Sequence, residues 1–177
     1  MPMIIKVISI HEAHVSSLTK TLREILLCPL CSCLLRYRDS RLRIMKQEGG
    51  IQTKIPIRRL KCTGCGRIHT EIPSFLLPYK HYAAEVISGV LDGMIRPEDQ
   101  DSEDYPSLTT MKRWLRWFTR NLRRIESILQ RMLLRQSLPV PAQISSLIRI
   151  LRTNYPDWLE RIIPIFYNNA EELPSNP

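Results

Sequence analysis

Two short motifs decide the fold of this chain: CPLC at residues 28–31 and CTGC at residues 62–65. In each motif two residues separate the cysteines, so a tight turn can direct both sulfurs at one ion, and two such turns complete a closed tetrahedron. A closed tetrahedron leaves no position for water and therefore stabilises a fold rather than catalysing hydrolysis. We predict one structural Zn²⁺ per chain, with the ligands Cys28, Cys31, Cys62 and Cys65.

A disulfide framework is the alternative interpretation of this spacing. The chain contains five cysteines, an odd number, and residues 1–10 lack the charged, apolar and small-residue order of a secretory signal. Zinc is therefore favoured over disulfides or free thiols.

Several residues next to the motifs bear on the geometry of the site. We expect Gly64 and Gly66 to support the second turn by adopting positive φ angles. Ser32 stands where a glycine is expected, so the first turn is expected to be less regular. Cys33 is expected to be a partly buried residue beside the site, with a role as substitute ligand as the alternative. His69 is expected to be a polar residue on the strand that leaves the second motif, although it could also replace a sulfur.

The charge of the chain is concentrated in two segments. The formal net charge is +9, and residues 33–72 carry ten Lys/Arg against three Asp/Glu, whereas residues 107–137 carry eight against one. Such segments favour a polyanionic partner. No apolar run approaches the roughly 18 residues that span a bilayer, so we expect a cytoplasmic protein with no membrane association. Nothing in the sequence indicates a small-molecule substrate.

The segment around the cysteines has the pattern of a zinc ribbon. Alternating apolar residues predict strands at residues 34–45 and 53–61, a hairpin turn at 48–50 and a third strand at 68–72. So small a sheet buries too little apolar area to be stable without its metal. A further short strand is expected at residues 3–10, and residues 11–26 are weakly helical.

The second half of the chain has helical patterns. Residues 79–91 predict a short amphipathic helix, and residues 108–135 predict a long one with Ser107 as its N-cap. Two more short helices are expected at 142–152 and 158–167, with Pro164 bending the second, before a frayed tail. On the long helix the expected apolar stripe consists of Met111, Leu115, Phe118, Leu122, Ile125, Leu129, Met132 and Leu133. The opposite face carries Arg113, Arg116, Arg120, Arg123, Arg124 and Arg131, with Trp117 among them.

The predicted fold class is α+β: a small antiparallel zinc ribbon followed by an all-α, helix-turn-helix-like region with one long basic amphipathic helix. The expected divisions are an N-terminal strand and helix of unclear role (1–27), the zinc ribbon (28–78), the helix-turn-helix-like region (79–137) and C-terminal helices with the tail (138–177).

Three stretches carry a resemblance to a known group: CPLC at 28–31, RRLKCTGCGRIHTEIPSFLLPYKHYAAEVI at 58–87 and SLTTMKRWLRWF at 107–118. They resemble small bacterial proteins associated with mobile elements, in which a zinc ribbon precedes a helix-turn-helix-like segment. They are also similar to the N-terminal recognition part of certain transposases, which binds the terminal repeats of the element. The resemblance implies a transposase accessory or regulator. The chain departs from this group at Ser32-Cys33, where a glycine usually follows the motif.

The leading hypothesis is a non-catalytic protein that binds double-stranded DNA. The carboxylates Asp99, Asp101, Glu103 and Asp104 are crowded together and offer no two-metal nuclease site. We expect the start of the long helix to reach base edges and the ribbon to contact phosphates. The expected contacts are Thr109, Thr110, Lys112, Arg113, Arg116, Trp117, Arg120, Arg123 and Arg124 on the helix and Arg36, Arg38, Arg41, Arg43, Arg58, Arg59 and Lys61 on the ribbon.

Two alternatives remain open. The first is a zinc-ribbon interaction module that recruits a transposase or polymerase partner, or self-associates, through the C-terminal helices. The second is RNA binding, which aromatic residues on an exposed sheet face would favour. The ribbon strands offer only Tyr37 for that purpose.

Overall fold

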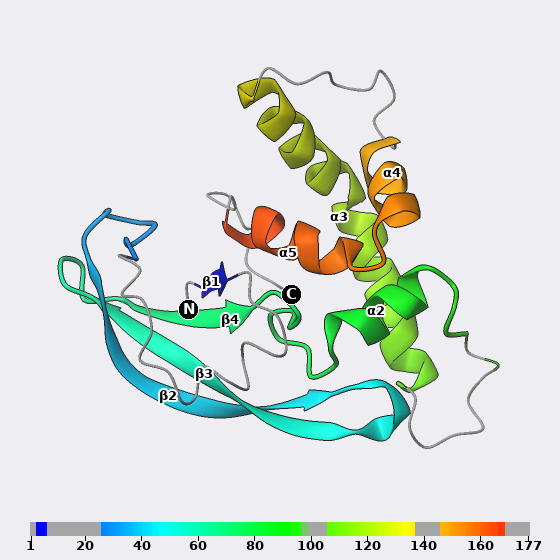
Figure 1. Cartoon of the computed structure of the whole chain (residues 1–177), viewed down its shortest axis with the longest axis horizontal. Helices are drawn as coiled ribbons and strands as arrows, with labels where there is room; N and C mark the ends of the chain where they lie inside the picture. The colour runs from blue at the N-terminus through cyan, green and yellow to red at the C-terminus, as the bar shows by residue number, and fades with distance from the viewer. Residues whose placement is uncertain (1–2, 7–25, 97, 99–105, 137–145, 169–177) are drawn as a thin grey trace.

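The computed structural model describes residues 3–6, 26–96, 98, 106–136 and 146–168. Their fold is α+β, as predicted, with the sheet below and beside a group of helices (Figure 1). In chain order the elements are β1 (Met3–Lys6), β2 (Leu35–Lys46), the 3₁₀ turn η1 (Glu48–Gly50), β3 (Gln52–Cys62), β4 (Ile68–Pro73), α2 (Ala84–Leu91), α3 (Leu108–Arg135), α4 (Ser146–Asn154) and α5 (Trp158–Asn168).

The sheet has the strand order β1-β4-β3-β2. The strands β2, β3 and β4 pair antiparallel, and their bounds differ by one residue at most from those expected, so the three-stranded ribbon prediction is confirmed. The early strand is also confirmed over Met3–Lys6, where it pairs parallel to β4, while the rest of that prediction lies outside the described residues. The hairpin turn is formed by Gly49 and Gly50, both with positive φ.

The helix predicted at residues 79–91 begins later, at Ala84, so the prediction was wrong for its first five residues. Tyr79 has a φ of 61°, a left-handed conformation that a right-handed helix does not allow. Backbone hydrogen bonds then hold the next residues against β2: the Lys46 N–H donates to the His81 carbonyl, and the Ala83 N–H donates to the Lys46 carbonyl. Strand-like pairing therefore replaces the first turn of the expected helix.

The long helix α3 has the predicted bounds and the predicted cap, because the Ser107 side chain accepts a hydrogen bond from the Thr110 N–H. Its buried face is turned relative to the predicted stripe. Leu115 is 41% exposed, whereas Trp114, which was not placed on the stripe, is 2% exposed and packs edge-to-face on Tyr82 with ring centroids 5.2 Å apart. The contact between Trp114 and Tyr82 thus decides which residues in the first turns of α3 face the core.

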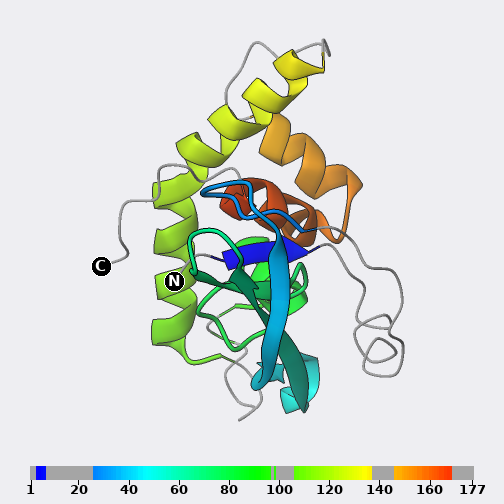
Figure 2. The same ribbon diagram turned by 90° about the vertical axis from the view of Figure 1, so that its left-hand side faces the viewer.

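One hydrophobic core joins the sheet to the helices. Met45, Ile55 and Ile57 of the hairpin belong to the same buried cluster as α2, α3 and α5, so the core extends across the division expected at residue 78. A separate, much smaller cluster lies at the other end of the hairpin, around Leu35 and Leu60. Figure 2 shows the helices stacked over one side of the sheet, with α3 along one edge of the molecule.

Residues 92–107 separate α2 from α3. A helix-turn-helix unit joins its helices by a turn of about three or four residues, so this pair does not have that geometry. The two C-terminal helices are confirmed, α4 beginning at Ser146 and α5 containing Pro164; residues 142–145 and the tail beyond 168 lie outside the described residues. None of the described helices is both long and apolar enough to cross a membrane.

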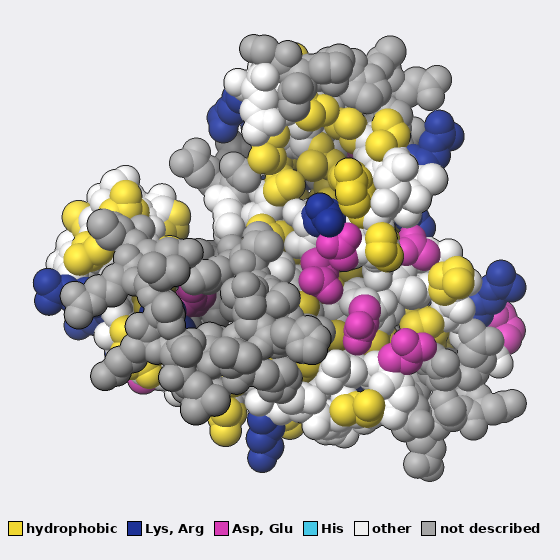
Figure 3. All heavy atoms as spheres, viewed as in Figure 1, with side chains coloured by type: hydrophobic (Ala, Val, Ile, Leu, Met, Phe, Trp, Pro, Cys, Tyr) yellow, Lys and Arg dark blue, Asp and Glu magenta, His cyan; other side chains and the backbone are white. Residues whose placement is uncertain are grey.

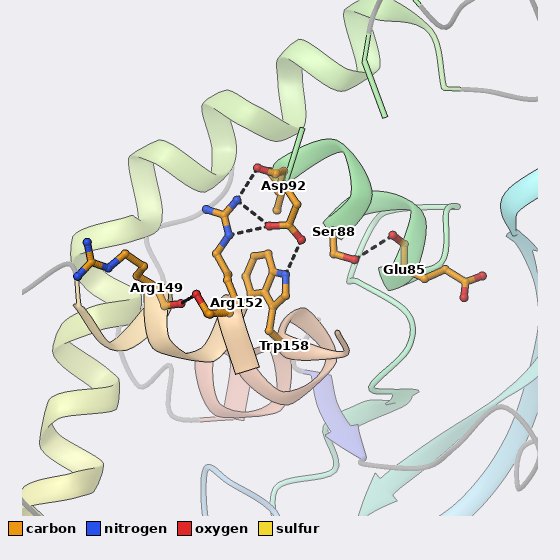
Figure 4. Close-up of polar contacts among 8 residues, drawn as sticks. Glu85, Ser88, Asp92, Arg149, Arg152 and Trp158 are labelled. Atoms are coloured by element: carbon orange, nitrogen blue, oxygen red, sulfur yellow. Dashed lines mark hydrogen bonds and ion pairs between the residues drawn. The ribbon is translucent and has the colours of Figure 1, made fainter. Parts of the chain in front are cut away.

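A polar bracket fixes the C-terminal helices to α2 (Figure 4). Asp92, which follows α2, accepts hydrogen bonds from the Arg152 guanidinium (2.6 Å) and from the Trp158 indole N–H (2.8 Å). Arg152 also donates to the Leu91 carbonyl at the end of α2. Arg152 of α4 therefore satisfies a carbonyl at the end of α2, and Trp158 of α5 binds the Asp92 side chain beside it, so these helices are part of one packed unit.

Candidate metal centre and basic surfaces

The two cysteine motifs meet at one end of the sheet. Cys28 and Cys31 lie on the turn before β2, Cys62 ends β3, and Cys65 lies on the turn before β4. The four sulfurs lie within 4.8 Å of one another, with Cys28 to Cys65 at 3.8 Å and Cys31 to Cys62 at 3.4 Å. A tetrahedron with Zn–S bonds of about 2.3 Å has edges of about 3.8 Å, so the sulfurs fit a four-coordinate ion. This group could hold a metal ion.

Backbone pairing brings the motifs together. Leu35 and Cys62 are register partners in the hairpin, and the Thr63 N–H donates to the Leu34 carbonyl at 3.0 Å. Within the first turn the Ser32 N–H donates to the Cys28 carbonyl at 2.8 Å. The hairpin therefore sets the distance between the two turns, and each turn sets the distance within its own cysteine pair.

The residue after each motif has a left-handed backbone: Ser32 has a φ of 55° and Gly66 a φ of 70°. The prediction for Gly66 is therefore confirmed, and Ser32 is held in a conformation that L-residues adopt at a cost. Gly64 does not have a positive φ. It is needed for space, because a Cβ there would lie 2.5 Å from the Cys33 sulfur. Cys33 is half-buried beside the site, as predicted.

Backbone N–H groups contact three of the four sulfurs. The Gly64 backbone N–H donates to the Cys62 sulfur at 3.4 Å, and the backbone N–H groups of Cys33 and Arg67 donate to Cys31 and Cys65. The Cys33 hydrogen bond, with help from neighbouring thiols, lowers the pKa of Cys31 to about 6. Although the Arg67 hydrogen bond acts in the lowering direction, burial and the neighbouring sulfurs raise the pKa of Cys65 to about 11. The environment thus favours the thiolate of Cys31 and the neutral thiol of Cys65. A bound dication would favour the thiolate form of both cysteines, because it compensates the charge of several thiolates at once.

The polar neighbour of the Cys28 sulfur is a side chain. His69 on β4 is fully buried, and its Nε2 lies 3.3 Å from the Cys28 sulfur. Burial, together with the charge of Arg67, lowers the pKa of His69 and favours the neutral ring. Its Nδ1 has no hydrogen-bond partner among the described residues. His69 is on the expected strand, where it contacts the Cys28 sulfur.

Comparison with known proteins adds one result. Residues 28–114 match the profile of a domain of unknown function (DUF6431), a segment that contains all four motif cysteines and ends in α3 at Trp114. No curated protein and no solved structure matches the chain. These comparisons show no link to mobile elements or transposases.

The structure divides the basic residues expected on the ribbon into two groups. Arg43 is turned inward and donates to the carbonyls of Leu77 and Lys80, and Arg59 forms a two-bond ion pair with Asp39. These two guanidinium groups are engaged within the fold. Arg58 is half-exposed and pairs with the buried Glu71 at 3.4 Å.

The remaining ribbon cations are exposed. Arg36, Arg41 and Lys61 form no ion pair with any described residue, and Arg38 lies 3.7 Å from Asp39. They are not adjacent to the start of α3, because Tyr82, which packs on Trp114, lies beside Lys46 at the opposite end of the hairpin from the cysteines. The expected ribbon and helix contacts therefore form separate basic surfaces.

On α3 the expected cations lie mainly on one exposed face. Lys112, Arg113, Arg116, Arg120, Arg123 and Arg131 are exposed, and none forms an ion pair with a described residue. Thr109 is exposed, whereas Thr110 is half-buried at the helix cap. Arg124 is half-buried over the Phe166 ring. Trp117 is also half-buried, and its ring packs edge-to-face on Phe166 of α5 instead of standing among the arginines.

The contact of His69 with the Cys28 sulfur was not predicted, and its only signal in the sequence was the position of His69 four residues after Cys65. Tyr37, the one aromatic residue that the ribbon strands offer, is exposed together with its neighbours Arg36 and Arg38.

Proposed function

We propose that the chain is a non-catalytic nucleic-acid-binding protein that docks α3 against duplex DNA and uses a structural Zn²⁺ to hold the far end of its sheet. One observation carries this proposal. The only acid on α3, Glu126, is fully buried and accepts a hydrogen bond from the Ile148 N–H at the start of α4. No acid on α3 itself therefore compensates the cations of its exposed face, and none of these cations pairs with an acid among the described residues, which is unusual for a merely solvated face.

The dimensions of this face suit a nucleic acid. From Lys112 to Arg131 the stripe extends about 30 Å at 1.5 Å per residue, comparable to one turn of duplex DNA at about 34–36 Å. Thr109, Lys112, Arg113 and Arg116 lie at the start of the helix, where a reading helix contacts base edges. Arg120 and Arg123 follow on the same face as phosphate contacts.

The distribution of acids supports this orientation. Glu85, Asp157 and Glu160 line a depression between α2 and the start of α5. Figure 3 shows acidic side chains gathered near the middle of the face that carries α4 and α5, and only scattered Lys and Arg there. A polyanion is repelled from such a face, so the α3 stripe is the favoured side for binding.

The interaction-module alternative has weaker support. It assigned the apolar C-terminal helices to a partner, but α5 buries Trp158, Leu159, Ile162, Ile163 and Phe166 in the core of the chain itself. The biological setting that we propose, a mobile-element accessory or regulator that binds terminal repeats, rests on the motif resemblance alone.

A binding titration tests the proposal. Fluorescence anisotropy with a labelled blunt duplex, at several salt concentrations, should give binding whose logarithmic salt slope falls by about 0.9 for each phosphate contact removed. Arg113→Ala/Arg120→Ala should weaken binding and lower that slope. Lys54→Ala/Arg149→Ala removes the same charge from exposed positions outside the stripe and should have a much smaller effect. Equal losses in the two double variants would reject α3 as the docking element.

A further inference from the structure

A depression borders the candidate metal centre on the β2–β3 hairpin. It has a volume of about 490 Å³, and it is lined by Arg36, Tyr37, Arg38, Lys61, Cys62, Thr63, Gly64 and Gly66. Three of these eight residues are cationic and one is aromatic. The depression lies at the cysteine end of the sheet, away from the start of α3.

The aromatic residue is exposed. Tyr37 is the register partner of Leu60, and the register shifts between Tyr37 and Asp39. Leu60 is 1% exposed, whereas Tyr37 is 59% exposed. Irregularities of strand pairing, such as β-bulges, are frequent beside functional sites.

The exposed ring is held in place. The Arg58 guanidinium lies 5.8 Å from the centroid of the Tyr37 ring, and the Tyr37 hydroxyl lies 3.2 Å from the Ser40 hydroxyl. An exposed tyrosine with two such contacts loses little further freedom when a flat ligand stacks on it.

The cations of the depression form an unusual pair. Arg36 and Lys61 are directly opposite each other in the register, and neither forms an ion pair with a described residue. Like charges directly opposite on a sheet are destabilising, unless an anion lies between them. Cys62, which follows Lys61 in the chain, also lines the depression.

We propose that this depression binds one nucleotide of an unpaired nucleic-acid strand, with its base stacked on Tyr37 and its phosphate held between Arg36 and Lys61. The inference rests on the proposed nucleic-acid function and adds a second contact of different chemistry. Single-strand sites combine an aromatic platform with cations that follow the backbone in this way. The protein would then bind a duplex with an unpaired tail more tightly than a blunt duplex.

The test uses the full chain and labelled duplexes that are blunt or carry an unpaired six-nucleotide DNA or RNA tail. Stacking of one base is worth about 5- to 150-fold in affinity. Tyr37→Ala should therefore lose about that factor for a tailed probe and leave the blunt duplex unchanged, while Tyr37→Phe should retain tail binding. Lys61→Ala should also weaken tail binding. The DNA and RNA tails distinguish the two sources of the same unpaired nucleotide.

The chain offers a matched control in Tyr155, which is 41% exposed and has the Arg161 guanidinium 4.4 Å from its ring centroid. Tyr155→Ala should leave the affinity for both probes unchanged. If Tyr37→Ala and Tyr155→Ala leave tail binding equally intact, the nucleotide site is rejected while duplex binding by α3 stands. If the wild-type protein binds the tailed probe but not the blunt one, α3 docking is rejected and the depression remains. Binding of neither probe rejects both.

Discussion

The two ends of the β2–β3 hairpin are stabilised by different means. At the helical end, Met45, Ile55 and Ile57 enter a continuous core with α2, α3 and α5. At the cysteine end, the buried cluster consists of Cys28, Leu35, Leu60 and Cys62, with Leu26 and Cys33 packed against it. Apolar burial can therefore stabilise the helical end of this hairpin but not its cysteine end.

Magnitudes make the difference clear. Full burial of a leucine is worth about 1.5–3 kcal/mol, so Leu35 and Leu60 together supply about 3–6 kcal/mol. Ordering the backbone costs about 1–2 kcal/mol per residue, and the two motif turns with their flanking strands contain many residues. The cysteine end needs a further source of free energy, and a metal bound by four thiolates can supply it.

The largest expected effect is therefore the response to metal removal. A structural Zn²⁺ contributes on the order of 10 kcal/mol to such a site. Chelation should release one metal ion per chain and should remove hydrogen-exchange protection from the turns at residues 28–33 and 62–67 and the adjoining strand ends. Protection of α3 and α5 should remain. Elemental analysis and hydrogen exchange measured by mass spectrometry check both statements.

The matched variants are Cys62→Ser, which should behave like the chelated protein, and Cys33→Ser, which should retain the metal. Purified protein with well under half an equivalent of metal and unchanged exchange after chelation would contradict the metal-supported end. Loss of protection in α3 and α5 as well would show that the two ends do not differ as described.

The second expected effect concerns the helical end of the hairpin, which the apolar core stabilises. Trp114→Ala should cost about 3–5 kcal/mol of unfolding free energy, because it empties a fully buried position that packs on Tyr82. Denaturant unfolding followed by circular dichroism measures the loss. Leu115→Ala, one residue along and 41% exposed, should cost much less. A similar loss in both variants would contradict the observed rotation of α3.

The sequence predicted the regular elements well because their signals are local. The alternation of β2 and β3 and the 3.6-residue period of α3 with its Ser107 cap need no tertiary information. The four cysteines could be predicted equally well, since the spacing of two ligands within a motif is a property of its turn alone. These features place the candidate metal centre without a structure.

Features that depend on tertiary contacts could not be predicted from the sequence in the same way. Pairing of residues 81–83 with Lys46 decides where α2 begins, and the contact with Tyr82 decides that Trp114 faces inward. Arg43 and Arg59 are residues of the type that contacts phosphates. Within the fold, however, Arg43 donates to backbone carbonyls and Arg59 pairs with Asp39. Net charge along the sequence therefore overestimates the available binding surface.

A third expected effect sharpens the account of the metal centre. The Nε2 of the fully buried His69 lies 3.3 Å from the Cys28 sulfur and can donate to a Cys28 thiolate, so His69→Leu should remove this contact and accelerate metal loss. Outer hydrogen bonds to ligands are typically worth about 10- to 100-fold in metal affinity. His69→Gln retains an N–H donor and should restore much of the affinity, which a purely steric role would not predict.

Competition with a chromophoric chelator measures the affinity, and the thiolate charge-transfer bands of the Co²⁺-substituted protein report the ligand set. Four-sulfur bands should be seen in wild type and in both His69 variants. Loss of one sulfur band in wild type relative to His69→Leu would instead make His69 a ligand in place of a cysteine.

The smallest expected effect concerns a single backbone conformation. Ser32 and Gly66 follow the second cysteine of each motif, and both are left-handed, with φ of 55° and 70°. A left-handed L-residue costs about 1–2 kcal/mol, whereas glycine avoids that cost but loses about 0.5–1 kcal/mol of extra backbone entropy on folding. Ser32→Gly should therefore stabilise the metal-bound cysteine end by about 0.5–1 kcal/mol. The reciprocal change, Gly66→Ser, should destabilise it by a similar amount, because nothing lies within 4 Å of a Cβ at that position and only the backbone conformation opposes the side chain.

Gly64→Ala tests a different cause, since its Cβ would meet the Cys33 sulfur at 2.5 Å, and Cys33→Ala in the same chain should relieve part of its cost. Chelator-dependent unfolding of the cysteine end orders these variants. If Ser32→Gly destabilises that end as much as Gly66→Ser does, the left-handed turn at Ser32 is not the conformation that the metal-bound protein adopts.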